Sequence, residues 1–145
     1  IKLHIRYRAN QKNKIFLNKR IKIFNIYKKL LKQYDLPLKQ LKVSLPKLSA
    51  HHLLIVYIKF NNKLSKNNFF KKMLKKKIYI QQHYIPINKF SISKKFNNSK
   101  EKLINADYYY KNAVSLPIYS ELKLETIKYI VKEIKIILDA KIKSI

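Results

Sequence analysis

The stretch "KKKIYIQQHYIPINKF", residues 75–90, decides the fold because it contains a strand, the end of that strand and a turn. Ile78 and Ile80 alternate with Tyr79, which is typical of a strand with one buried face. Four hydrogen-bonding side chains follow: Gln81, Gln82, His83 and Tyr84. Pro86 then forces an extended turn. Strand ends often carry ligand contacts, but a lone histidine there is also common as a structural residue, so both interpretations remain open.

Amphipathic segments surround this strand in the sequence. Apolar residues at steps of three and four predict helices over residues 13–34, 66–76 and 122–142, and a shorter one over 102–113. Runs rich in β-branched and aromatic residues predict strands over residues 48–60, 77–84 and 114–120. Residues 88–100 are expected to form a polar loop. Short strands interleaved with helices predict an α/β or α+β domain with one small sheet flanked by helices.

The composition allows a folded domain with a real core. The chain has 145 residues, of which 47% are hydrophobic, and a net charge of +27. Such a charge can indicate a nucleic-acid partner. However, Lys, Ile, Asn, Tyr and Phe make up 84 residues, all types that A/T-only codons can encode, and Arg contributes only 3. Phosphate-binding surfaces usually concentrate Arg as well as Lys, so compositional drift is our preferred explanation of the charge.

Several classes of site are excluded or disfavoured. The chain has no Cys and no Gly, which removes thiolate metal sites and the usual glycine-rich phosphate loop. His51 and His52 open a strand without further ligands nearby, so no metal site is expected, and His51 is expected to face solvent. The acidic residues lie in Lys-rich stretches and are expected to be solvated ion-pair partners. The longest apolar run, residues 53–58, is too short to span a membrane, so we expect a cytoplasmic protein.

Four segments, in order, resemble the DegT/DnrJ/EryC1/StrS family of sugar aminotransferases. The stretch "KIYIQQHYIPINKF" is similar to that family's His-Tyr-x-Pro strand and turn. "NADYYYKNAVSLPIYS" resembles its Tyr-Tyr helix followed by Ser-Leu-Pro. "SAHHLLIVYI" is similar to the first strand of the family's small domain, and "NKIFLNKRIKIFNIYKKLL" to the helix that joins its two domains. Within the family, "QQHYIPI" most resembles the transaminases of the pseudaminic acid pathway.

The resemblance implies a fold, a reaction and a domain division. The fold is the C-terminal small domain of the aspartate aminotransferase fold (fold type I), with residues 1–36 as a remnant of the large domain and inter-domain helix, and 37–145 as the small domain. The family works as a homodimer and uses pyridoxal 5'-phosphate (PLP) to move an amino group from glutamate to a nucleotide-linked keto sugar. The lysine that carries PLP belongs to the large domain, so a C-terminal fragment or split-gene product is expected to be inactive alone.

The resemblance also implies which residues bind the substrate. Gln81, Gln82, His83 and Tyr84 match the substrate-contacting segment of the family. "IRYR", residues 5–8, resembles a motif near the PLP phosphate, with Arg6 in place of Asn and a shortened connection before the next helix. Lys77 stands where the family has Gly, and Asn88 where it often has a second His. No catalytic residue and no metal ligand is expected within this chain.

Two other classes of function remain as alternatives. The first is a small basic nucleic-acid-binding protein of the ribosomal type, whose binding would fall steeply with salt. Lysines gathered on one face beside exposed tyrosines would favour it, whereas lysines on all faces would favour drift. The second is a non-catalytic partner that pairs with an intact aminotransferase subunit through exposed apolar faces. The absence of glycine further predicts poorly fitting turns and low stability.

Overall fold

The computed structural model describes the backbone of residues 2–41, 49–95 and 103–142. One antiparallel sheet forms the centre, and its strands lie in the order β1-β2-β4-β3. The strands are β1 Leu38–Gln40, β2 Leu54–Ile58, β3 Gln81–Gln82 and β4 Ala113–Leu116. The predicted mixed α/β fold with one small sheet is therefore confirmed, and β1 is a strand that the sequence did not reveal.

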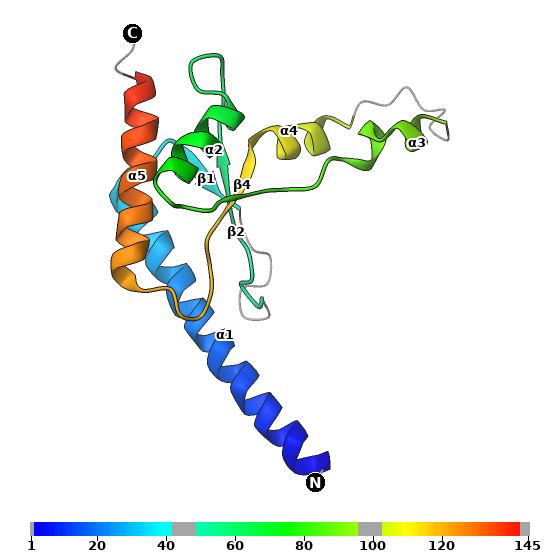
Figure 1. Ribbon diagram of the computed structural model, residues 1–145, viewed down its shortest axis with the longest axis vertical. Coiled ribbons are helices and arrows are strands. Elements are labelled where there is room, and N and C mark those ends of the chain that lie inside the picture. The colour runs from blue at the N-terminus through cyan, green and yellow to red at the C-terminus, as the bar shows by residue number, and fades with distance from the viewer. Residues whose placement is uncertain (1, 42–48, 96–102, 143–145) are drawn as a thin grey trace.

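Helices cover the buried face of the sheet, and α1 packs beside α5 along it (Figure 1). The helices are α1 Lys2–Gln33, α2 Lys66–Lys75, α3 Ser91–Lys94, α4 Ile104–Asn112 and α5 Leu124–Ile142, with a 3₁₀ turn, η2, at Ile87–Lys89. The predicted helices over residues 66–76, 102–113 and 122–142 are confirmed. The helix predicted from residue 13 is confirmed but begins earlier, at Lys2.

Alternation along β2 explains how the sheet divides its two faces. Leu54, Val56 and Ile58 are buried, whereas Ile55 and Tyr57 are half-buried on the opposite face. The buried set packs against apolar side chains of α1, α2 and α5: Ile23, Tyr27, Leu31, Phe69, Met73, Ile127, Ile130, Val131, Ile134 and Leu138. The helices therefore take one face of the sheet, and the opposite face is left for α4 and the candidate site.

Three turns use residues with positive φ where glycine is usual. They are Asp35 at 45°, His51 at 44° and Lys77 at 57°. Lys77 follows α2: its N–H donates to the carbonyl of Leu74 at 2.8 Å, and that of Ile78 donates to Met73 at 3.0 Å. This pair of bonds is the Schellman arrangement that ends many helices, and its left-handed position favours glycine. The expectation of poorly fitting turns in a chain without glycine thus has a concrete site at Lys77.

Some expectations from the sequence are wrong. "IRYR" lies within the continuous helix α1, so there is no shortened connection before the helix, and the side chains of Arg6 and Arg8 lie outside the described part. Part of the loop expected over residues 88–100 is helical, in η2 and α3, and its last five residues lie outside the description. His51 is only 5% exposed and packs on Phe24, with ring centroids 4.3 Å apart. The reason is that the bend at His51 turns its ring inward and leaves His52 exposed.

Candidate functional site

The candidate residues 81–84 lie at the edge of the sheet, where the chain leaves β3. Gln81 pairs with Ser115 and Gln82 with Val114 of β4, so β3 is a border strand. Both glutamines are exposed, and Tyr84 is 96% exposed. Beyond them the chain runs out from the body toward η2 and α3 (Figure 1). The sequence predicted a strand over residues 77–84 with these four residues at its end. The structure keeps them at a strand end, but the predicted strand is too long, because only Gln81–Gln82 pair with β4.

His83 is the member of this group with fixed contacts. Its Nε2 lies 3.0 Å from the hydroxyl oxygen of Ser115. Its ring meets that of Tyr109 edge-on, with centroids 5.0 Å apart. Burial lowers the pKa of His83 below its ordinary value of 6.5, and the positive charge of Lys66 lowers it further. The imidazole is therefore a neutral group that can accept or donate a hydrogen bond at neutral pH.

Aromatic side chains of α4 support His83 from the side opposite to the core. Tyr109 also packs on Tyr57 of β2 with centroids 6.0 Å apart, and burial followed by the proximity of Tyr57 raises the pKa of Tyr109. Lys66 donates to the carbonyl of Tyr110 at 2.7 Å, and burial lowers the pKa of Lys66. These groups hold one wall of the site rigid. Sequence reasoning missed Ser115 and Tyr109, although both lie in one of the four segments that carry the family resemblance, residues 105–120.

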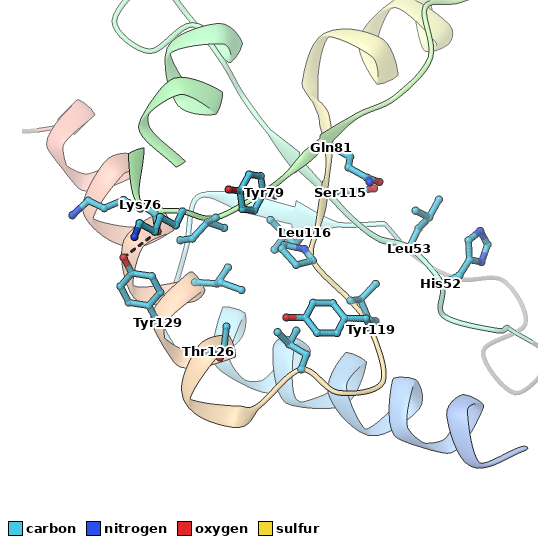
Figure 2. A pocket seen from close by; sticks show the side chains of 16 residues that line it. His52, Leu53, Lys76, Tyr79, Gln81, Ser115, Leu116, Tyr119, Thr126 and Tyr129 are labelled. Carbon is cyan, nitrogen blue, oxygen red and sulfur yellow. Dashed lines mark hydrogen bonds between the residues drawn. The ribbon is translucent and has the colours of Figure 1, made fainter. Parts of the chain in front are cut away.

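A cavity of about 600 Å³ opens beside this edge of the sheet. Figure 2 shows Lys76, Tyr79 and Tyr129 on one side, Tyr119 at another, and Leu53 with His52 opposite. Gln81 and Ser115 belong to its wall, so the cavity adjoins the candidate residues. Ser115 therefore lines the cavity and also contacts His83.

The cavity does not by itself suit PLP. The pyridine nitrogen of that cofactor needs an acidic partner and its aldehyde a free lysine amine. None of the described residues that line the cavity is Asp or Glu. Lys76 on its rim is paired with Glu133, at 3.1 Å between Nζ and Oε2. Lys77 could offer an amine, but the described lining still lacks the acidic partner. Glu133 is buried, so the expectation that the acidic residues are all solvated is wrong for this one.

The described residues add three further findings. No three or more acidic, His or Cys side chains among them come together in a way that could hold a metal ion. No helix in the described ranges is long and apolar enough to cross a membrane. Exposed lysines lie on α1, α2, α4 and α5 alike rather than on one element.

Comparison with known proteins decides the family. Residues 11–135 match the model of the DegT/DnrJ/EryC1/StrS aminotransferase family. The chain belongs to this family. The match includes the candidate residues 81–84 and the supporting residues Tyr109 and Ser115, so the whole candidate site lies in the part of the chain that the family shares.

The family's relatives are longer than this chain. UDP-4-amino-4,6-dideoxy-N-acetyl-beta-L-altrosamine transaminase of Campylobacter jejuni is 32% identical over 114 residues, which are 79% of this chain and 30% of the relative. The chain is also similar to the solved structure of the Helicobacter pylori aminotransferase PseC, described as involved in pseudoaminic acid biosynthesis. That similarity has a TM-score of 0.72 at 23% identity and covers 86% of this chain and 33% of PseC. The chain thus spans about a third of these relatives.

The same fold also carries another reaction. GDP-4-keto-6-deoxy-D-mannose-3-dehydratase of E. coli, solved with hydrated PLP, has a TM-score of 0.73 at 16% identity over 88% of this chain and 33% of its own. This likeness shows the fold alone. The small domain is therefore shared by enzymes with different chemistry, and the reaction has to be argued from the family and the site.

Proposed function

We propose that this chain is the C-terminal part of a PLP-dependent aminotransferase that acts on a nucleotide-linked keto sugar in surface-sugar biosynthesis. The match of residues 11–135 to an aminotransferase family carries the proposal. In it, residues 1–36 are a remnant of the large domain with the inter-domain helix, and 37–145 are the small domain. The first turns of α1, which extend beyond the rest of the body in Figure 1, agree with a helix that bridges two domains.

The role of the chain in this proposal is to bind and orient the substrate. PLP, when bound to the whole enzyme, supplies the electron sink for moving the amino group. Gln81 and Gln82 present amide groups that can hydrogen-bond a sugar or a carboxylate. The imidazole of His83 is oriented by its contact with Ser115, and burial favours its neutral form. The exposed hydroxyl of Tyr84 completes the group of residues 81–84, which we call the polar strip. Glutamate is the proposed amino donor, and a homodimer the proposed assembly.

The chain alone is proposed to be inactive, because the lysine that carries PLP belongs to the family's large domain. Mixing the purified chain with PLP, followed by gel filtration and an absorbance scan, tests this point. We expect no visible absorbance of lysine-bound cofactor to remain with the protein. PLP that stays bound in a stoichiometric amount would contradict the proposal that the PLP-carrying lysine belongs to the large domain.

A chimaera tests the substrate role directly. The chain replaces the matching C-terminal third of the Campylobacter jejuni relative, and glutamate-dependent transamination of that enzyme's sugar is measured. We expect activity in the chimaera, and a KM raised about tenfold or more by His83→Ala or Gln81→Ala, since each removes one hydrogen bond of about 1.5 kcal/mol to the substrate. Gln33→Ala, at the exposed end of α1, is the matched control. Equal effects of Gln33→Ala and Gln81→Ala would refute the assignment.

A further inference from the structure

The cavity beside β3 exists because strand pairing stops early. Gln82 pairs with Val114 and Gln81 with Ser115. Continued by two more steps, this register would place Tyr79 opposite Pro117. Proline has no backbone N–H and cannot donate to a sheet ladder. β3 and β4 therefore separate on the Ile80 side of Gln81. The space between the two segments is the cavity, which we call the fork, and α5 forms its floor (Figure 2).

The walls of this fork are mostly aromatic and aliphatic. Three tyrosines, at positions 79, 119 and 129, stand at its sides, and Leu116, Ile118 and Ile130 line its interior. Tyr79 is 72% exposed, so its ring is held at the rim rather than in the core. Flat aromatic walls around an apolar floor favour a flat ligand that stacks on them. The volume of about 600 Å³ lies within the range of roughly 300–1,000 Å³ typical of small-molecule sites.

The charges of the lining residues define the ligand further. Lys76 and Lys77 lie at one end, and the described lining contains no Asp or Glu. Lys76 is neutralised by Glu133. Within the described part of the chain, the ion pairs include none at Lys77, so its ammonium can pair with a ligand. The other polar side chains of the described lining are His52, Gln81, Ser115, Thr126 and the tyrosine hydroxyls, too few to satisfy the many hydroxyls of a bare sugar.

We propose that this fork is a second binding site, adjoining the polar residues 81–84 and sharing Gln81 with them, for a planar aromatic compound with one anionic group. The ring system stacks between the tyrosines at positions 79 and 129, and the anionic group lies near Lys77. One end of the ligand contacts Ser115, the residue that fixes His83. The site therefore lies directly behind the candidate substrate residues.

The test uses the 145-residue chain and 2-naphthoate as the probe, followed by amide NMR shifts. We expect saturable shifts in both chain segments that enclose the fork, at residues such as Tyr79 before β3 and Ile118 after β4. Cyclohexanecarboxylate, which is anionic but not planar, and 2-naphthylmethylammonium, which is planar but cationic, should each bind at least about tenfold more weakly. Tyr79→Ser should weaken 2-naphthoate about fivefold, and Lys77→Gln about threefold.

Two control variants distinguish binding at the fork from nonspecific binding of 2-naphthoate to the protein surface. Phe90→Ser removes an exposed aromatic ring outside the fork, and Lys71→Gln removes an exposed lysine of α2. Both should leave the affinity for 2-naphthoate unchanged. Shifts spread over the whole chain, equal binding of the three probes, or equal effects of Phe90→Ser and Tyr79→Ser would each overturn the proposal. Circular dichroism of every variant confirms that the fold is retained.

Discussion

The hydroxyl oxygen of Ser115 lies 3.0 Å from Nε2 of His83, although the two residues are 32 positions apart in the sequence. Ser115 is buried in β4, and His83 lies just after β3, so the pairing of these two strands brings them together. The contact ties the most informative polar residue of the site to the centre of the sheet. It is therefore the first interaction to perturb.

Ser115→Ala should lower the free energy of unfolding by about 1 kcal/mol, because it removes one part-buried hydrogen bond of His83. Urea unfolding measures the loss, and the ring signals of His83 should shift in NMR spectra. Ser120→Ala is the control, since the hydroxyl of Ser120 makes an exposed hydrogen bond to the carboxylate of the neighbouring Glu121. Equal losses in the two variants would show that the bond between Ser115 and His83 contributes nothing.

The stability should depend on pH through His83. Burial and Lys66 lower its pKa in the folded state, so protonation favours the unfolded chain. The stability that neutral His83 contributes to the folded state is fully present above the ordinary pKa of 6.5. It is lost as the pH falls below that value toward the folded-state pKa. Urea midpoints of the wild type and His83→Gln, measured from pH 8 to pH 5, check this. The difference between the two should change in this window; a constant difference would contradict it.

Lys77→Gly should stabilise the chain by about 1 kcal/mol. Lys77 has φ of 57° in the left-handed turn after α2, where a side chain is unfavourable and glycine is not. Thermal unfolding measures the gain. Lys75→Gly, inside the last turn of α2, is the matched control and should destabilise by about 1 kcal/mol. If both substitutions destabilise, the strain assigned to the turn is absent.

Lys76→Met should destabilise the chain by about 1 to 3 kcal/mol at neutral pH. The substitution keeps the aliphatic stem but leaves the buried carboxylate of Glu133 without its partner at 3.1 Å. Lys72→Met, on an exposed position of the same helix, should change stability by less than about 0.5 kcal/mol. Chemical denaturation of both variants decides the matter, and a loss shared equally by both would count against the pair.

Tyr27→Phe should raise the free energy of unfolding by about 1 kcal/mol. The ring of Tyr27 is fully buried, and its hydroxyl has no hydrogen-bond partner among the described residues. Burial, followed by the nearby Tyr119, raises the pKa of this hydroxyl far above the ordinary value of 10.0. Tyr129→Phe instead removes a hydroxyl that donates to the carbonyl of Lys76 at 3.3 Å and should give a slight loss. Urea unfolding distinguishes the opposite signs.

Local pattern was sufficient for most of α1, for α2, α4 and α5, and for the position of the candidate residues 81–84, but it missed η2 and α3. The burial of Met73 and Phe69 follows from their spacing on α2, and the alternation of Ile78, Tyr79 and Ile80 correctly separated buried from exposed side chains. The pairing of strands could not be read in this way. β3 is only two residues long, and its partner segment in β4 runs into Pro117, which cannot donate to a ladder; no pattern within residues 77–84 carries that information.

The supporting residues of the site were also beyond a local pattern. Ser115 and Tyr109 meet His83 only through the order of strands in the sheet and the return of α4. His51 was assigned to solvent because its backbone bend, with φ of 44°, has no signature in a chain that lacks glycine. In each case the missing information is long-range geometry rather than residue chemistry.

The two borders of the sheet are its shortest strands, with three residues in β1 and two in β3. A border strand of that length offers another molecule few free backbone groups to pair with. The separation of β3 and β4 on the Ile80 side of Gln81 keeps the β3 edge short. Growth of the sheet by addition of strands from neighbouring molecules is thereby disfavoured. Short border strands of this kind are one of the ways in which proteins avoid edge-to-edge pairing between molecules.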